Sequence, residues 1–213
     1  MAQSSEKKLI QIDATMDTVC PWCFMGKKNM EKAINSSRDQ YDFEIRYHSF
    51  FLDSSAPKNG VLKSEFYGSK FGAAQWKRMA AHMGQLFQTY GLEYDTAGLT
   101  GNTLDSHRII NFAGTQGLDK QNALVEEILM NYFVHGKFIG DRQMLLEAAE
   151  KAGVMGAAEL LEDQNKGLKE VYEDIRTFSS HISGVPHYVI NGKQELNGAQ
   201  PPEAFLKAFQ AAK

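Results

Sequence analysis

The sequence predicts an α/β fold in which one βαβ unit opens the chain, a helical block follows, and a ββα unit closes it. Two observations predict this order: apolar residues alternate with polar ones near both ends, and the middle of the chain has helix-forming composition. We expect residues 1–55 and 168–213 to form one α/β unit, with residues 56–167 as an all-helical insertion.

The first unit begins with a strand over Leu9–Met16, where apolar residues alternate with polar or small ones. Pro21 suits the first turn of a helix, because its missing N–H costs nothing there. That helix is expected to run to about Ser36, and a second alternating run predicts a strand from Phe43 to about Phe51.

The helical block follows a Ser-, Pro-, Asn- and Gly-rich linker at residues 53–60. A helical segment over residues 64–90 is expected to break at Gly68, Gly72 and Gly84. Three further helix signals come next: Thr103–Gln116 closed by Gly117, a helix capped by Asp119 and stopped at Gly136, and one opened by Asp141.

The last unit begins with an amphipathic helix. Its apolar stripe consists of Leu168, Val171, Tyr172, Ile175, Phe178 and Ile182. Asn191-Gly192 is a strong hairpin signal between strands at residues 187–190 and 194–196. A final helix after Pro201-Pro202 has an inner face of Ala204, Phe205, Ala208 and Phe209.

The chain has two cysteines, both in the segment Cys20-Pro21-Trp22-Cys23, directly after the first strand and at the start of a helix. A helix N-terminus stabilises a thiolate, and a second thiol one turn further on can resolve a mixed disulfide. A structural disulfide would close too small a loop to stabilise the fold, and a zinc site would need two more ligands. Two inert buried thiols are a further alternative. We interpret the pair as a redox-active dithiol.

Val185-Pro186 stands at the entrance to the strand at residues 187–190, where a proline is confined to edges or special bonds. Taken alone, it predicts an ordinary trans proline, because few X–Pro bonds are cis. If the bond were cis, the loop could lie against the cysteine turn and offer the backbone of Val185 to an extended substrate.

Together these features resemble the thioredoxin fold, and more narrowly its DsbA-like branch, which carries a helical insertion. The order of Cys20-Pro21-Trp22-Cys23, Gly184-Val185-Pro186 and Asn197-Gly198-Ala199-Gln200-Pro201 resembles the FrnE-type group within that branch. Segments of the helical block also resemble that group: Asn102-Thr103, His107-Arg108, Tyr132-Phe133, Gly136 and Asp141.

The resemblance implies that the Val185-Pro186 bond is cis, that Cys20 attacks and that Cys23 resolves. It also implies that Pro21, Trp22, Val185, Pro186 and His187 contact the substrate. The Pro-Trp dipeptide between the cysteines lacks the histidine of the periplasmic oxidant. His187 stands where an apolar residue is expected; it could tune the thiolate, contact substrate, or face solvent as an ordinary strand residue.

Three further sets of residues are weaker candidates. Asp13 or Asp17 could relay a proton for Cys23, although an acid near a strand end is usually solvated. His107-Arg108 is expected to cap or solvate a helix. Trp22, Met25, Met79 and Met83 could line an apolar groove, but core filling is the usual role of methionine.

The charge pattern excludes several classes of partner. The formal net charge is −3 with both signs mixed along the chain, so nothing predicts nucleic-acid binding. No run of 18 apolar residues occurs, so no membrane span is predicted. The segment Met1–Lys8 lacks the pattern of a secretory signal, which predicts a cytoplasmic protein.

The sequence therefore predicts a thiol–disulfide oxidoreductase that needs no bound cofactor or metal. Its expected partners are disulfide-containing proteins or small thiols such as glutathione, and a homodimer is compatible with the sequence. The alternative is a glutathione-dependent transferase or isomerase of the kappa class, in which serine typically occupies the position of Cys20. The third hypothesis is a non-catalytic holdase, which binds unfolded chains in the helical groove. The Cys20→Ser substitution would leave that binding activity intact.

Overall fold

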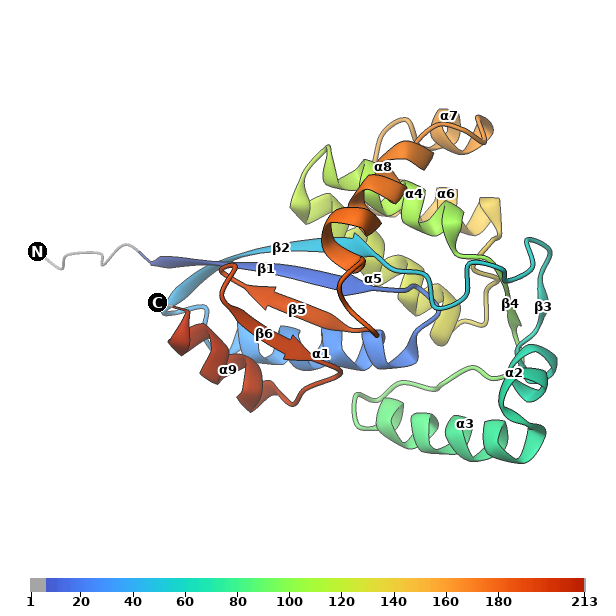
Figure 1. Ribbon diagram of the computed structural model, residues 1–213, viewed down its shortest axis with the longest axis horizontal. Coiled ribbons are helices and arrows are strands. Elements are labelled where there is room, and N and C mark those ends of the chain that lie inside the picture. Colours follow the sequence, from blue (N-terminus) through green and yellow to red (C-terminus); the bar gives the residue numbers. More distant parts are fainter. Residues whose placement is uncertain (1–6, 213) are drawn as a thin grey trace, which may run out of the picture.

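The computed structural model describes residues 7–212, so the prediction for the segment Met1–Lys8 falls largely outside the described residues. A four-stranded sheet with the order β2-β1-β5-β6 forms the centre of the fold (Figure 1). Its strands are β1 (Lys8–Met16), β2 (Tyr41–Ser49), β5 (His187–Ile190) and β6 (Gln194–Asn197). β1 and β2 are parallel, whereas β5 is antiparallel to both β1 and β6.

One face of the sheet packs against α1 (Pro21–Asn35) and α9 (Pro202–Ala211) (Figure 1). The parallel register aligns Ile10, Ile12 and Ala14 with Phe43, Ile45 and Tyr47, so alternate side chains of both strands share this face. The rings of Phe43 and Phe209 lie 5.1 Å apart, and those of Tyr188 and Phe205 lie 5.0 Å apart. These contacts form the core between the sheet and the two helices.

The opposite face of the sheet packs against α8 (Leu168–Asp174), which continues into a π-helical turn, η1 (Ile175–Ser179). The predicted amphipathic helix is thus present, with Val171 fully buried. Tyr172 was placed on its inner stripe wrongly, because its side chain is 55% exposed. The turn widens at η1, and the ring of Phe178 stacks on His48 with centroids 3.6 Å apart.

The outer edge of β2 is covered by α5 (Leu118–Phe133). The side-chain amide of Gln121 accepts from the backbone N–H of Tyr47 at 2.9 Å and donates to its carbonyl at 3.2 Å. Asn122 donates to the carbonyl of Ile45 at 2.8 Å. Because these amides occupy backbone groups that an open edge would expose, α5 protects the sheet from further strand pairing.

The insertion contains more than helices, which corrects the prediction of an all-helical block. Its helices are α2 (Lys63–Phe71), α3 (Ala73–Gln88), α4 (Leu104–Gly114), α5, α6 (Arg142–Lys151) and α7 (Ala157–Glu162). In addition, β3 (Val61–Leu62) and β4 (Leu99–Thr100) pair as a small antiparallel sheet. Strands of two residues are too short to show a period in the sequence.

Helix boundaries also differ in detail from the predictions. Gly72, with φ +87°, separates α2 from α3, whereas Gly68 and Gly84 lie inside those helices. Asp119 does not cap α5, because the helix already starts at Leu118 and Asp119 lies in its first turn. Asp141 does cap α6, where its carboxylate accepts from the N–H of Gln143 at 2.9 Å.

Candidate active site

Both cysteines lie at the start of α1, just after the turn that connects β1 to this helix. Cys20 is the N-cap of α1 and its backbone N–H donates to the carbonyl of Asp17 at 3.1 Å, which closes the turn between strand and helix. The N–H of Cys23 donates to Cys20 Sγ at 3.3 Å. A sulfur at this position accepts a donor from the free end of the helix, which a thiolate does more strongly than a thiol.

The two thiols differ in their surroundings. Cys23 is fully surrounded by protein, and this burial raises its pKa well above the ordinary value. The hydrogen bond with Cys20 and the charges of Cys20 and Asp17 act in the same direction. Cys23 is therefore held as a thiol until the charge beside it changes, as it does when Cys20 enters a disulfide.

The loop before β5 lies against the cysteine turn. The Val185–Pro186 peptide bond is cis, the form that the resemblance implies. The Cys20 thiol donates to the carbonyl of Val185 at 3.8 Å. A Cβ built on Gly26 of α1 would meet Pro186 Cγ at 3.0 Å, so this helix and the proline are in direct contact. The structure thus brings Cys20, Pro21, Val185 and Pro186 together.

His187 lies apart from this group. It pairs with Thr15 in the register between β1 and β5, so its side chain points to the face of the sheet opposite to that of Tyr188 and α1. The side chain is only 2% exposed, which contradicts the reading that it faces solvent. Its Nε2 lies 3.5 Å from the carboxylate of Glu195.

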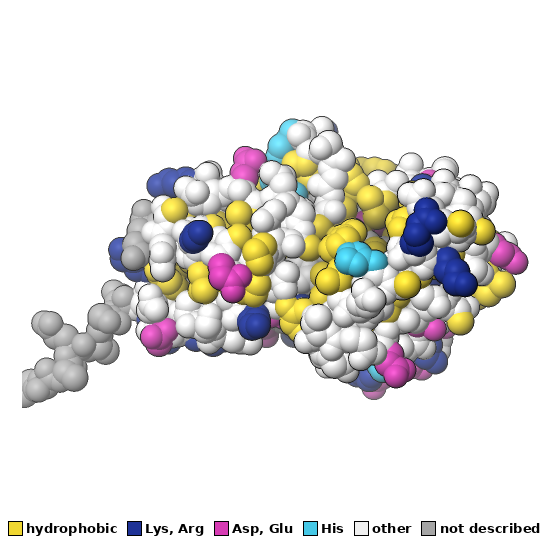
Figure 2. All heavy atoms as spheres, turned by 90° about the horizontal axis from the view of Figure 1, so that it is seen from below, with side chains coloured by type: hydrophobic (Ala, Val, Ile, Leu, Met, Phe, Trp, Pro, Cys, Tyr) yellow, Lys and Arg dark blue, Asp and Glu magenta, His cyan; other side chains and the backbone are white. Residues whose placement is uncertain are grey.

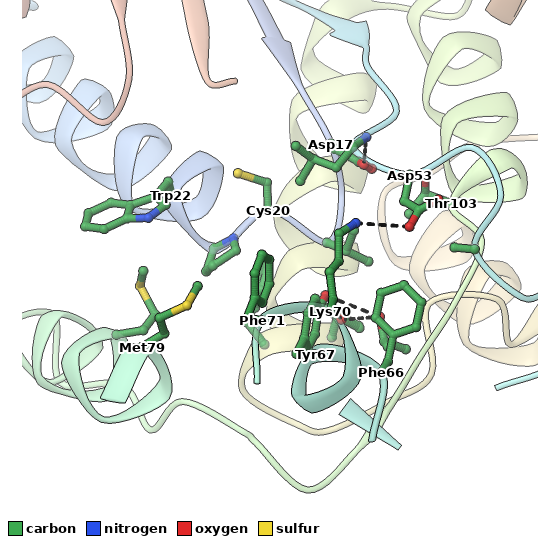
Figure 3. Close-up of a pocket in the computed structure, with 18 of the residues that line it drawn as sticks. Asp17, Cys20, Trp22, Asp53, Phe66, Tyr67, Lys70, Phe71, Met79 and Thr103 are labelled. Carbon is green, nitrogen blue, oxygen red and sulfur yellow. Dashed lines mark hydrogen bonds and ion pairs between the residues drawn. The ribbon is translucent and has the colours of Figure 1, made fainter. Parts of the chain in front are cut away.

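A pocket of about 370 Å³ opens beside Cys20 (Figure 3). Trp22 of α1 forms one side, and Phe66, Tyr67 and Phe71 of α2 face it, with Met79 of α3 beside Trp22. The indole ring of Trp22 also contacts the ring of His82, with centroids 6.0 Å apart. Met83 lines the pocket as well, whereas Met25 is buried in the core, so one candidate methionine of the predicted groove lies outside it.

Sequence reasoning missed the aromatic residues of α2 that form the far side of this pocket. Their signal is a cluster of large apolar residues, Phe66, Tyr67, Phe71 and Trp76, in helices with few buried positions. From sequence alone, such a cluster is interpreted as part of the hydrophobic core, because nothing in the sequence shows that few positions of these helices are buried.

Asp17 is buried beside the pocket, and Asp13 is not part of it. Leu52 N–H donates to Asp17 Oδ2 at 2.8 Å, and Asp17 Oδ1 lies 3.1 Å from His107 Nε2. Asp13 instead contacts His48 Nε2 at 2.8 Å on the opposite side of the sheet. Of the two acids considered as a proton relay, the structure therefore places only Asp17 among the residues lining the pocket.

Of the two roles expected for His107 and Arg108, capping or solvating a helix, solvation is wrong, whereas Arg108 does bind carbonyls at the end of α7. His107 is 1% and Arg108 2% exposed. Arg108 donates to Asp105 and to the carbonyls of Leu160, Asp163 and Lys166. The three carbonyls come from a distant segment of the insertion and therefore leave no local pattern in the sequence.

Within residues 7–212, no group of three or more His, Cys, Asp or Glu side chains is placed to hold a metal ion. In the same part of the chain, every helix is too short or too polar to cross a membrane.

Comparison with known proteins places the chain in a family. The sequence is 25% identical to the uncharacterized protein YwbO of Bacillus subtilis, over 94% of this chain and 96% of that protein. The structure matches a probable DsbA oxidoreductase of Streptomyces coelicolor with a TM-score of 0.85 and 27% identity, over 95% of this chain and 89% of that one.

Two solved structures share the fold at lower identity. The cytosolic disulfide reductase DsbM of Pseudomonas aeruginosa, solved with glutathione, has a TM-score of 0.60 and 17% identity over 94% of this chain and 98% of that one. A 2-hydroxychromene-2-carboxylate isomerase has a TM-score of 0.66 and 15% identity over 95% of this chain and 93% of that one. The model of the DSBA-like thioredoxin domain matches residues 11–210, and the chain therefore belongs to the family of DsbA-like thioredoxin domains.

Proposed function

We propose that the protein is a thiol–disulfide oxidoreductase in which Cys20 is the nucleophile and Cys23 the resolving thiol. One observation carries the proposal: Cys20 lines a pocket and its thiol contacts the Val185 carbonyl, whereas Cys23, one turn further along α1, is not among the residues that line the pocket. Only one of the two thiols is thus within reach of a substrate.

The chemistry follows from that asymmetry. The Cys20 thiolate attacks one sulfur of a substrate disulfide, forms a mixed disulfide and releases the first substrate thiolate. Cys23 then loses its proton and attacks Cys20 Sγ, which releases the second substrate thiolate and forms the Cys20–Cys23 disulfide. The substrate gains two electrons and the dithiol loses two. In the oxidising direction the same steps run in reverse.

The Val185 carbonyl and the exposed edge of Trp22 border the position that the incoming disulfide would occupy. Pro21, Pro186 and Trp22 are proposed as substrate contacts on this basis. His187 points to the other face of the sheet, and we do not propose it as one.

The substrates that we propose are disulfides of proteins or of small thiols, glutathione among them, and the compartment is the cytosol. The support is the likeness in fold to DsbM, which is described as a cytosolic disulfide reductase and was solved with glutathione. No bound cofactor is needed, because both electrons come from the two thiols.

A second candidate, a glutathione-dependent isomerase or transferase, is favoured by the likeness in fold to the chromene-carboxylate isomerase. Three features of this chain argue against the isomerase or transferase hypothesis. A cysteine stands where such enzymes typically have serine, and a resolving Cys23 follows it. In addition, Gly198-Ala199-Gln200 occupies the segment where a Ser-Asp pair would hold the γ-glutamyl end of glutathione.

The test is to trap the mixed disulfide. Reduced Cys23→Ser protein treated with a disulfide should retain one substrate thiol, seen by intact mass, and wild-type protein should lose two hydrogens instead. Cys20→Ser protein, which keeps only the buried Cys23, should form the adduct much more slowly than Cys23→Ser protein. Equal labelling of Cys20→Ser and Cys23→Ser would refute the assigned roles.

A further inference from the structure

We propose that the pocket beside Cys20 selects neutral, apolar disulfides over anionic ones such as oxidised glutathione. The ligand would be a small molecule whose reactive sulfur carries an uncharged aromatic or aliphatic group. This inference rests on the proposed function and names the substrate class of the same site.

The first argument is access. Cys20 is only 4% exposed, so its sulfur is reached through the pocket and not from an open surface. A volume of about 370 Å³ lies at the lower end of the range of small-molecule sites, about 300–1,000 Å³. A compact group attached to sulfur fits this space.

The second argument is the chemistry of the walls. Trp22, Phe71 and Met79 line the pocket and are 43%, 38% and 40% exposed. Figure 2, which views the molecule from the side of α1 and α3, shows hydrophobic side chains gathered across the middle of this face. These apolar side chains are partly exposed to water. Binding of an apolar group that covers them is therefore favourable, because apolar surface is buried.

The third argument is charge. Among the described residues that line the pocket, Lys70 is the one ammonium, and Asp17 and Asp53 are carboxylates. Lys70 Nζ lies 3.0 Å from Asp53 Oδ2, and Figure 3 shows this pair directed away from Trp22 and Met79. Apart from the imidazole of His82, the described lining residues leave no cationic group unpaired, and the carboxylates of glutathione would approach two existing carboxylates.

The experiment compares two aromatic disulfides of different charge: dithiodipyridine, which is neutral, and dithiodinicotinic acid, which has the same ring with an added carboxylate. Reduced protein is mixed with each in single turnovers at about pH 8, where histidine is neutral. Each rate is divided by the rate of the same disulfide with 2-mercaptoethanol, a reference thiol without a carboxylate, which removes the difference in leaving group. Oxidised glutathione is the third substrate.

We expect the normalised rate for the neutral disulfide to exceed that for its carboxylate by about tenfold or more, as one unfavourable charge contact predicts. Met79→Lys places a cation in the pocket and should reduce the ratio to about threefold or less. Asp53→Asn frees Lys70 and should shift the ratio in the same direction. Met155→Lys is the matched control, because Met155 is 74% exposed and does not line the pocket.

Two results would overturn the inference: a normalised ratio near one in the wild type, or faster reaction with oxidised glutathione than with dithiodipyridine. An equal shift in Met79→Lys and Met155→Lys would do the same, since it would show an effect of net charge alone. If the protein reacts with none of the three disulfides, the proposed function itself fails. If it reacts with all three without preference, the function stands and only this inference falls.

Discussion

At the scale of single residues, Asp17 is the buried carboxylate that acts on Cys23. Burial is the largest cause of the raised pKa of Cys23; the charge of Asp17 raises this pKa further, whereas the backbone hydrogen bond from Asp17 lowers it. Asp17 is 1% exposed and is held by Leu52 N–H and His107. We propose that this carboxylate accepts the proton that Cys23 must lose.

Asp17→Asn should therefore slow the second step of the exchange and leave the first unchanged. General-base assistance of this kind contributes about 10²–10⁴-fold, and we expect a loss of at least about tenfold. Quenching with an alkylating agent at successive times resolves the mixed disulfide, which should accumulate in the variant. Asp42→Asn, with a side chain 66% exposed on β2, is the control. Equal slowing of both steps would point to a structural role for Asp17.

Close packing of α1 against the proline loop depends on the absence of a side chain at Gly26. A Cβ at this position would collide with the Tyr188 hydroxyl and press on Pro186 Cγ at 3.0 Å. Gly26→Ala should lower the free energy of unfolding by about 1–3 kcal/mol, because overpacking forces α1 and the proline loop apart. Urea denaturation measures it. Gly84→Ala, in open space on α3, should instead be neutral or stabilising by up to about 1 kcal/mol.

Some residues of the site could be predicted from sequence and others could not. Cys20 and Cys23 were identified because their spacing and their place before a helix have a chemical reason. Nothing in the sequence favoured Asp17 over Asp13 as the proton relay. The fold distinguishes them, because only Asp17 lines the pocket. The burial of His107 could not be predicted, because its partner Asp17 lies 90 residues away along the chain.

At the scale of elements, a buried histidine joins the sheet to the segment that leads to the proline loop. His48 of β2 is 3% exposed and contacts Asp13 of β1 at 2.8 Å and Asp174 of α8 at 2.7 Å. Burial alone lowers the pKa of His48, but the hydrogen bonds and charges of Asp13 and Asp174 outweigh it and raise the pKa. A carboxylate at each ring nitrogen therefore favours the charged imidazolium form of His48.

This linkage predicts how stability changes with pH. Because the pKa of His48 is higher in the folded than in the unfolded chain, its contribution is complete below about pH 6.5 and is lost as the pH rises through the folded value. Urea denaturation between about pH 6 and pH 8.5 should show the free energy of unfolding falling. In His48→Gln the slope over this range should be smaller. An unchanged slope would show that His48 does not contribute.

Element boundaries were predicted best where a local interaction sets them. The cap at Asp141 and the strands on either side of Asn191-Gly192 depend on neighbouring residues. The small sheet of β3 and β4 and the covering of β2 by Gln121 and Asn122 depend on residues far apart in sequence, and neither was foreseen.

At the scale of the whole molecule, Arg108 holds separate segments of the insertion together. Its guanidinium on α4 donates to the carbonyls of Leu160, Asp163 and Lys166, at the end of α7 and in the loop before α8. Arg108→Lys keeps the charge but cannot reach all three carbonyls from one nitrogen.

We expect Arg108→Lys to lower the free energy of unfolding by about 2–4 kcal/mol, because the buried guanidinium and the carbonyls that it binds lose hydrogen bonds. Thermal or urea denaturation would measure the loss. Arg38→Lys, at an exposed position after α1, should change stability by less than about 0.5 kcal/mol. A similar small effect at Arg108 would mean that water replaces the lost donors.

The overall architecture could be predicted from the sequence, whereas the aromatic wall of the pocket could not. The order of units and the helical insertion follow from periodicity and from a family resemblance. The pocket depends on how α2 and α3 sit over the cysteine turn, and this placement is set by contacts with α1 and the small sheet that no local pattern encodes.

The central claim is that Cys20 and Cys23 form a reversible redox pair. We would equilibrate the protein in buffers of varied ratio of reduced to oxidised glutathione, and measure the fraction of Cys20–Cys23 disulfide by acid quench and mass spectrometry. The account predicts one two-electron transition in the wild type, absent in Cys20→Ser and Cys23→Ser. A wild type that forms no such disulfide at any ratio, or only a stable glutathione adduct, would contradict the exchange mechanism and favour the glutathione-dependent transferase or isomerase.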